Sequence, residues 1–138
     1  MSDPLVFNVS WLAVALGAVA LFVLGGIWYT VLFGKAYRTE LGVPEDGPGP
    51  GDSLLKPLIG QLITSVVMAL LLAWFIGAAS IGTGALAGLG AGLLVGAAVT
   101  QLYQFEGRSI RHLLINVGYF LVGFTGVGAL IGYLQTPL

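Results

Sequence analysis

The stretch Gly84–Gly96, "GALAGLGAGLLVG", has glycine at positions 84, 88, 92 and 96 and contains no charged residue. Residues four apart lie on one face of an α-helix, so these glycines would form a stripe without side chains. Each glycine costs a helix in water about 1 kcal/mol relative to alanine. In a bilayer, by contrast, small residues let helix backbones approach and associate. The stretch therefore predicts a transmembrane helix packed closely against another helix.

The composition of the whole chain agrees with a membrane protein. Of its 138 residues, 57% are hydrophobic and only 8% are charged, whereas a soluble domain has about a quarter charged residues. The chain has no cysteine, which excludes disulfides, thiolate metal sites and cysteine nucleophiles. Its net charge of −1 gives no reason to expect a nucleic-acid partner. We expect most of the surface to face lipid, and we expect neither a metal nor a cofactor.

Four segments are apolar over the length of about 20 residues that a helix needs to cross a bilayer. Their apolar runs are continuous rather than alternating, which favours helices over a β-barrel. The first run is long and follows no basic region, so we expect no cleaved signal peptide. The sequence predicts an all-α fold: one transmembrane four-helix bundle over residues 1–138, with helices at 11–33, 57–79, 84–105 and 112–134 and a loop at 34–56.

The basic residues predict the orientation of this bundle. All of them fall in the first and third connections, at Lys35, Arg38, Lys56, Arg108 and Arg111. Because basic residues stay in the cytoplasm, both connections are expected there and both termini outside, in a bacterial cytoplasmic membrane. Tryptophans favour the membrane surfaces, so Trp11 and Trp74 are expected at the outer interface and Trp28 at the inner one. The proline- and glycine-rich "VPEDGPGPGD", residues 43–52, predicts an irregular loop.

The second span has a row of small residues that matches the glycine stripe of the third. The two spans are joined by a short connection, which predicts an antiparallel hairpin with small residues facing one another. The expected pairs are Gly77 with Gly84, Ala73 with Gly88, Ala69 with Gly92 and Ser65 with Gly96. One turn further on, the same register brings Gln61 close to Thr100. Alternatively, the stripe forms a seam between the subunits of a homo-oligomer.

Several short motifs resemble a known family. Gly25-x-x-Trp28-Tyr29 is followed by Leu32-Phe33-Gly34-Lys35, and "FEGRS" at 105–109 is followed by "LINVGY" at 114–119. With the layout of four spans, these motifs resemble the domain of unknown function 1761 family of small bacterial membrane proteins. Typical members have Ser-Pro after the Trp-Tyr pair and Trp where Tyr37 stands, whereas this chain has Thr30 and Val31. The resemblance implies a four-helix membrane fold and no established activity.

The polar residues near the spans gather on the side predicted to be cytoplasmic. If the first and third spans end side by side, four bases would surround a pocket for an anionic lipid head group or another small anion. The bases are Lys35, Arg38, Arg108 and Arg111, and the expected lining residues are Tyr29, Gln61, Gln104, Asn116 and Tyr119. In the alternative interpretation, the bases only set the topology and touch lipid phosphates loosely.

Three further predictions concern the start of the fourth span. Asn116 and Tyr119 lie on one helical face and are expected to point inward, where they would form hydrogen bonds between helices. Glu106 is expected to pair with Arg108 or Arg111. His112 is either an interfacial residue at a helix start or a titrating group that modulates the charge of the basic region.

The sequence does not predict a defined activity. No Asp, Glu, Lys or Arg lies deep in a span, which argues against proton-coupled export and leaves no catalytic residue to name. The leading hypothesis is a non-enzymatic binder of an anionic head group, or an accessory subunit of a larger membrane complex. The alternatives are an oligomeric transporter or channel with a path between subunits, and a membrane enzyme acting on lipid or quinone. Membrane lipids and further copies of the chain are the expected partners.

Overall fold

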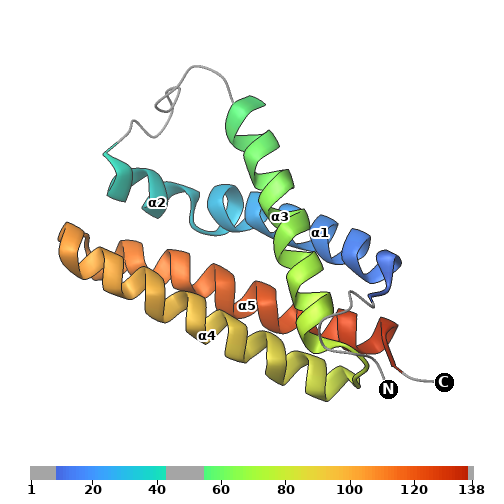
Figure 1. The fold of residues 1–138 in the computed structure, drawn as a ribbon. Helices are drawn as coiled ribbons and strands as arrows, with labels where there is room; N and C mark the ends of the chain where they lie inside the picture. Colours follow the sequence, from blue (N-terminus) through green and yellow to red (C-terminus); the bar gives the residue numbers. More distant parts are fainter. Residues whose placement is uncertain (1–8, 43–54, 137–138) are drawn as a thin grey trace.

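The computed structural model describes residues 9–42 and 55–136, and these contain helices and no strand (Figure 1). Four helical segments are long and apolar enough to cross a membrane, with α1 and η1 counted as one. Each begins and ends within one turn of the predicted residue, so the all-α fold with four membrane-length helices is confirmed. The elements are α1 Trp11–Gly26, the π-helix η1 Ile27–Leu32, α2 Gly34–Leu41, α3 Leu55–Ile76, α4 Ile81–Glu106 and α5 Ile110–Leu134.

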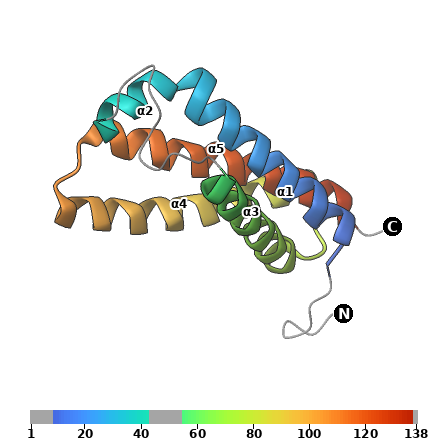
Figure 2. The ribbon, with the colours of Figure 1, turned by 90° about the horizontal axis from the view of Figure 1, so that it is seen from above.

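Helices α4 and α5 form an antiparallel hairpin and lie side by side in both views (Figures 1 and 2). The glycine stripe of α4 is buried in this interface. A Cβ atom at Gly84 or Gly88 would collide with a backbone oxygen of α5. Likewise, a Cβ atom at Gly128 of α5 would collide with the backbone oxygen of Gly84, and one at Gly132 would collide with that of Ser80, just before α4. The two backbones touch because both helices have glycine at the contact.

The glycine stripe of α4 therefore packs against α5, and the predicted hairpin of the second and third spans is wrong. The short turn from α3 to α4 brings their ends together but does not set their crossing angle. Beyond that turn α3 diverges steeply from α4 (Figure 1), leaving an apolar groove of about 610 Å³ between them. The pairs Gly77–Gly84, Ala73–Gly88, Ala69–Gly92 and Ser65–Gly96 do not form. Since α5 offers glycines where α3 offers alanine and serine, α5 allows the closer backbone approach.

Three other predictions depended on this hairpin: the packing role of Gly77, the approach of Gln61 to Thr100, and the alternative of a seam between subunits. Gly77 has a φ of 62° and nothing near its missing side chain, so it provides a turn rather than a packing surface. Thr100 donates to Gly96 O of its own helix at 2.7 Å, and Gln61 lies against Gly25 of α1 rather than against Thr100. The stripe is also covered by α5 within one chain, which argues against its use as a seam between subunits.

The small residues of α3 are buried away from α4, and Ala69 packs against α1. Ser65, Ala69 and Ala73 are fully buried, and a Cβ atom at Gly17 of α1 would lie 3.3 Å from Ala69 Cβ. Around this crossing, side chains of α1, α3 and α5 form the core. Its buried members are Ala13, Val14, Ala18, Leu21, Ala69, Leu72, Ala73, Phe124, Val127 and Ile131.

Gln135, at the end of α5, ties three helices together. Its Nε2 donates to Ala73 O at 3.0 Å and to Gly77 O at 2.8 Å, two carbonyls at the end of α3. Its Oε1 accepts a hydrogen bond of 2.9 Å from the backbone nitrogen of Ser10, which caps α1. One side chain thus bonds to backbone groups at the ends of α1 and α3, and Ala73 O accepts from Gly77 N at 3.0 Å as well.

The first span ends in a π-helix and a break, which redirects the chain into α2. Phe33 N donates to Trp28 O at 2.9 Å, and the Thr30 hydroxyl donates to Gly26 O. Phe33 then leaves the helical conformation, and α2 begins at Gly34. The bend arises from the wider turn and needs no proline. Helix α2 was not predicted, and residues 43–52 lie outside the described residues.

Candidate anion-binding site

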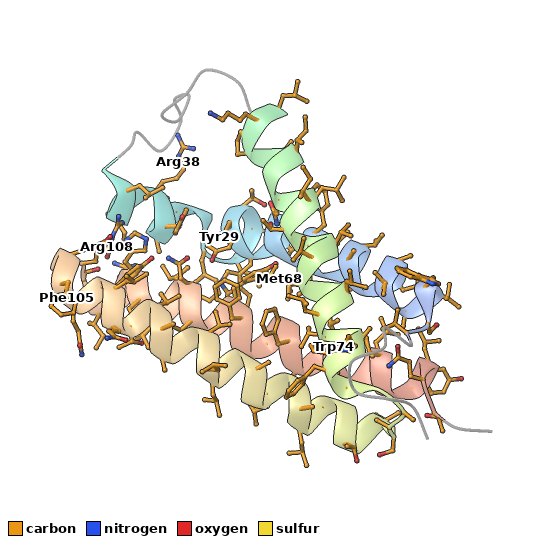
Figure 3. All side chains as sticks on the ribbon, in the orientation of Figure 1. Tyr29, Arg38, Met68, Trp74, Phe105 and Arg108 are labelled. Carbon is orange, nitrogen blue, oxygen red and sulfur yellow. The ribbon has the colours of Figure 1, made fainter. Side chains whose placement is uncertain are left out.

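One end of the molecule collects the basic residues of α2 and of the turn between α4 and α5. We call this the basic end; it contains Lys35, Arg38, Arg108 and Arg111. Arg38 and Arg108 are both labelled there in Figure 3. The connection between α4 and α5 is short, since Gly107 ends α4 with a φ of 68° and Ser109 caps α5. The α4–α5 hairpin and α2 therefore position the bases.

Behind the bases, Asn116 of α5 joins two other elements by hydrogen bonds. Its Oδ1 accepts from the Tyr29 hydroxyl of η1 at 2.6 Å, and its Nδ2 donates to the Tyr103 hydroxyl of α4. One turn along α5, the Tyr119 hydroxyl donates to Leu21 O of α1 at 2.9 Å. The prediction that Asn116 and Tyr119 point inward and link helices is confirmed.

Aromatic rings close this cluster under α2. The Tyr37 ring of α2 lies 4.7 Å from that of Tyr29 and 5.5 Å from that of His112, centroid to centroid. His112 also meets Tyr103 at 5.3 Å. Burial raises the pKa of Tyr37, so its hydroxyl stays neutral at physiological pH. We call Tyr29, Tyr37, Tyr103, His112 and Asn116 the tyrosine cluster.

His112 is the most buried polar group of this cluster, with 4% of its surface exposed. It lies in the first turn of α5, where its backbone nitrogen donates to Ser109 Oγ at 3.1 Å. Its imidazole contacts Tyr37 and Tyr103 but has no hydrogen-bond partner among residues 9–42 and 55–136. His112 does lie at the start of the fourth span, as predicted, but the rings around it bury its side chain.

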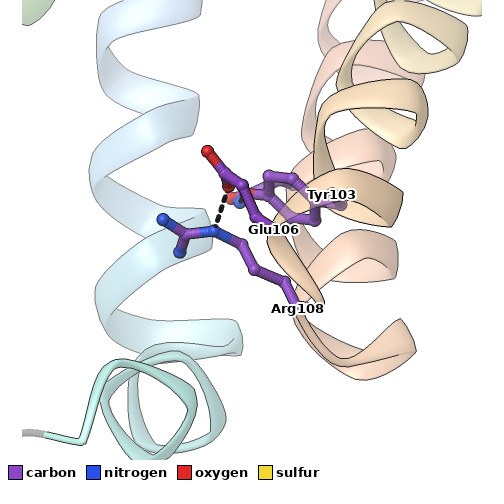
Figure 4. A network of polar contacts seen from close by, with 4 residues as sticks. Tyr103, Glu106 and Arg108 are labelled. Atoms are coloured by element: carbon purple, nitrogen blue, oxygen red, sulfur yellow. Dashed lines mark hydrogen bonds and ion pairs between the residues drawn. The ribbon is translucent and has the colours of Figure 1, made fainter.

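Arg108 is held at the surface of the cluster by two contacts (Figure 4). Its Nε donates to Glu106 Oε2 at 2.6 Å, which confirms the predicted pairing of Glu106. Its guanidinium carbon lies 5.3 Å from the centroid of the Tyr103 ring, a cation–π contact. The hydrogen bond to Glu106 raises the pKa of Arg108, so the guanidinium remains charged. Its terminal nitrogens have no acceptor within the described part of the chain.

Glu40 fastens α2 to the start of α5. The Ser109 hydroxyl donates to Glu40 Oε2 at 2.6 Å and at the same time accepts from His112 N. A negative charge is stabilised at a helix N-terminus, because the backbone N–H groups of the first turn point toward it. The Glu40 carboxylate thus lies where an anion is favoured.

The predicted site residues are brought together only in part. Tyr29, Asn116 and Tyr119 meet, and Gln61 lies next to them, with its Nε2 3.5 Å from Phe22 O. Gln104 is exposed on α4, and its side chain forms no hydrogen bond with the tyrosine cluster among the described residues. Arg111 is exposed in the first turn of α5, and Lys35 and Arg38 lie on α2.

Sequence reasoning omitted Tyr37, Tyr103, His112 and Glu40 from the site. The first three form the ring contacts of the tyrosine cluster, and Glu40 holds α2. The short connection between the third and fourth spans was a usable signal, because a hairpin there sets Tyr103 opposite His112. Tyr37 and Glu40 required knowledge of α2 and of its direction. Among the described residues, no three His, Asp or Glu side chains gather to hold a metal.

A family model described as "Protein of unknown function (DUF1761)" matches residues 12–132, which include all four spans and the tyrosine cluster. The chain belongs to this family. Comparison with curated proteins and with solved structures gives no match. The motif residues Tyr29, Arg108 and Asn116 of this family member all lie at the basic end or in the tyrosine cluster.

Proposed function

We propose that this protein binds the phosphate of an anionic lipid head group at its basic end, in a bacterial cytoplasmic membrane with that end facing the cytoplasm. The observation that carries the proposal is the set of contacts around the Arg108 guanidinium. Tyr103 and Glu106 fix its guanidinium, while its two terminal nitrogens remain open to an acceptor outside the described protein. A fixed guanidinium loses less conformational entropy on binding, and its planar fork fits two oxygens of one phosphate.

The charge at the basic end supports this proposal. The described residues at the basic end include four bases and only two acids. The bases are Lys35, Arg38, Arg108 and Arg111, and the acids are Glu40 and Glu106. Basic clusters next to the cytoplasmic ends of membrane helices attract anionic head groups. The positive-inside rule favours the same orientation, because the second connection and both termini lack bases. The proposal requires no chemical step, in keeping with the absence of a predicted catalytic residue.

The test is retention of phospholipid by the purified chain. Native mass spectrometry after a delipidating wash should find anionic phospholipid on the wild-type protein. In the double variant Arg108→Ala/Arg111→Ala, affinity should fall about thirtyfold, since each base near a membrane surface contributes about 1 kcal/mol. A zwitterionic lipid should be retained less by both proteins.

Lys56→Ala is the matched control. Lys56 lies in the first turn of α3, and that end of the helix stands apart from α4 and α5 (Figure 1), so the variant loses one positive charge away from the site. Its lipid retention should equal that of the wild type. If the control loses as much lipid per charge as the double variant, the bases act only as a diffuse positive surface and the proposed site is wrong.

A further inference from the structure

Helices α3 and α4 enclose an apolar groove beyond their short turn, where the two helices diverge (Figure 1). The groove has a volume of about 610 Å³. Met68 and Trp74, both labelled on α3 in Figure 3, line one wall, and Gly90 and Leu94 of α4 line the other. Phe124 of α5, which is only 4% exposed, lies at the base. None of the residues that line the groove is charged, which calls for an apolar occupant.

The rims of the groove are open to the surroundings of the protein. Phe75 at the α3 rim is 69% exposed, and Leu94 at the α4 rim is 74% exposed. Both helices are long and apolar enough to cross a membrane, so these surroundings are hydrocarbon chains. Water finds no partners between such walls, and an empty groove forfeits dispersion contacts of the atoms that line it. Part of the bilayer or of another protein therefore fills the groove.

The α3 wall is unsuited to a second membrane helix. Helices associate in membranes through small residues that let their backbones approach, as the glycines of α4 and α5 do here. The α3 wall instead presents the large side chains of Met68, Trp74 and Phe75, which keep a rigid neighbouring backbone at a distance. The volume of about 610 Å³ is typical of sites for single small molecules, roughly 300–1,000 Å³. The groove therefore suits one flexible hydrocarbon chain better than a helix.

We propose that the groove between α3 and α4 binds one acyl chain of a membrane lipid. A chain in the groove contacts α3, α4 and α5 at once, whereas a chain on a convex helix surface contacts one helix, so dispersion favours the groove. Gly90 leaves room for the chain, because no atom lies within 4 Å of the place where its Cβ would stand.

The site should select the acyl chain and not the charge of the head group. The connection between α3 and α4 contains no base, and neither wall of the groove is charged. Anionic and zwitterionic lipids with the same chains should therefore occupy the groove equally. This site is separate from the basic end and does not depend on the proposed function.

The test is photolabelling of the wild-type chain in vesicles of phosphatidylcholine, a small fraction of which has a diazirine in its acyl chain. Illumination attaches the lipid to residues beside the chain, and mass spectrometry of fragments locates them. Leu93 and Leu94 are neighbours at the same depth and are 56% and 74% exposed, but only Leu94 lines the groove. We expect Leu94 to be labelled roughly five times more than Leu93, because a chain held by three helices stays longer than one on a single surface.

Gly90→Leu fills the groove, and Gly126→Leu is the matched control. Gly126 of α5 also has no atom within 4 Å of its missing Cβ, and it does not line the groove. Gly90→Leu should lower the labelling of Leu94 to that of Leu93, whereas Gly126→Leu should keep the wild-type ratio. Arg108→Ala/Arg111→Ala should keep it too, because those bases lie at the other end of α4. Phosphatidylglycerol with the same diazirine chain should give the same ratio as phosphatidylcholine.

Each other result contradicts the acyl-chain site. Equal labelling of Leu93 and Leu94 in the wild-type chain would mean that only ordinary boundary lipid is present. Weaker labelling of Leu94 than of Leu93 would mean that a second copy or another protein covers the groove. An unchanged ratio in folded Gly90→Leu would place the bound chain elsewhere. If circular dichroism shows that Gly90→Leu is unfolded, the wild-type ratio decides by itself. Loss of anionic lipid retention in Arg108→Ala/Arg111→Ala with an unchanged ratio would support both sites.

Discussion

The two principal helix pairs, α4–α5 and α1–α3, use small residues in different ways. Along α4–α5, glycines of both helices meet, and Gly84 and Gly88 touch the backbone around Gly128. The pair stays side by side over its whole length (Figures 1 and 2). Along α1–α3, Ala69 of α3 lies against Gly17 of α1, in a core that also contains Leu21, and the pair crosses steeply (Figure 1).

The difference shows that a row of small residues does not determine its own partner. Glycine on both sides permits backbone contact along the helix, with weak Cα–H···O bonds adding to dispersion. Alanine and serine keep a Cβ atom, so backbones stay further apart and larger side chains enter the interface. A crossing then replaces a long hairpin. The comparison predicts that the two pairs respond differently to one added methyl group.

The largest expected effect is that of Gly88→Ala. The new Cβ atom would collide with Phe124 O and its carbonyl carbon, backbone atoms that cannot rotate away. The hairpin must separate, and we expect a loss of about 3 kcal/mol in the free energy of unfolding, the upper range for overpacked sites. Unfolding by a denaturing detergent, followed by circular dichroism, measures this loss.

Gly90→Ala is the matched control for that variant. Gly90 lies two residues further along α4 on the side of the apolar groove, and no atom lies within 4 Å of the place where its Cβ would stand. Its replacement should leave stability unchanged or raise it by up to about 1 kcal/mol through helix propensity. Equal stability of the two variants would contradict the backbone contact between α4 and α5.

An intermediate effect is expected for Gln135→Ala, which tests how the two pairs are joined. The variant loses the hydrogen bonds to Ala73 O, Gly77 O and Ser10 N. At about 0.6 kcal/mol for each such bond in membrane proteins, the loss should approach 2 kcal/mol. Gln101→Ala, on the exposed face of α4, should be neutral in the same assay. If the two variants unfold alike, Gln135 does not hold the ends of α1 and α3.

The sequence was sufficient for the existence and extent of the four spans, because hydropathy and length decide these locally. It was not sufficient for their pairing. The small residues of α3 and the glycines of α4 do pack in helix interfaces, but each row meets a different helix from the one predicted. Gly128 and Gly132 are evident in the sequence. The sequence does not give the crossing angle of α3, however, and that angle is what leaves α5 as the helix that packs along α4.

The candidate site could be predicted to a similar degree. Asn116 and Tyr119 were expected to point inward from their spacing, and Glu106 was expected to pair with a nearby arginine, because both inferences are local. The positions of Tyr37 and Glu40 depend on a change of chain direction at Phe33. That change comes from a π-helical turn without proline, and no simple sequence pattern marks it.

The smallest expected effect is at the α1–α3 crossing itself. Ser65 is fully buried, and its hydroxyl has no hydrogen-bond partner among the described residues. Ser65→Ala removes this unpaired group and leaves the Cβ atom that fills the interface. Stability should therefore stay the same or rise by up to about 1 kcal/mol, measured by the same detergent unfolding. A clear loss of stability would mean that the hydroxyl has a partner in the membrane, and that polar bonding rather than shape holds this pair.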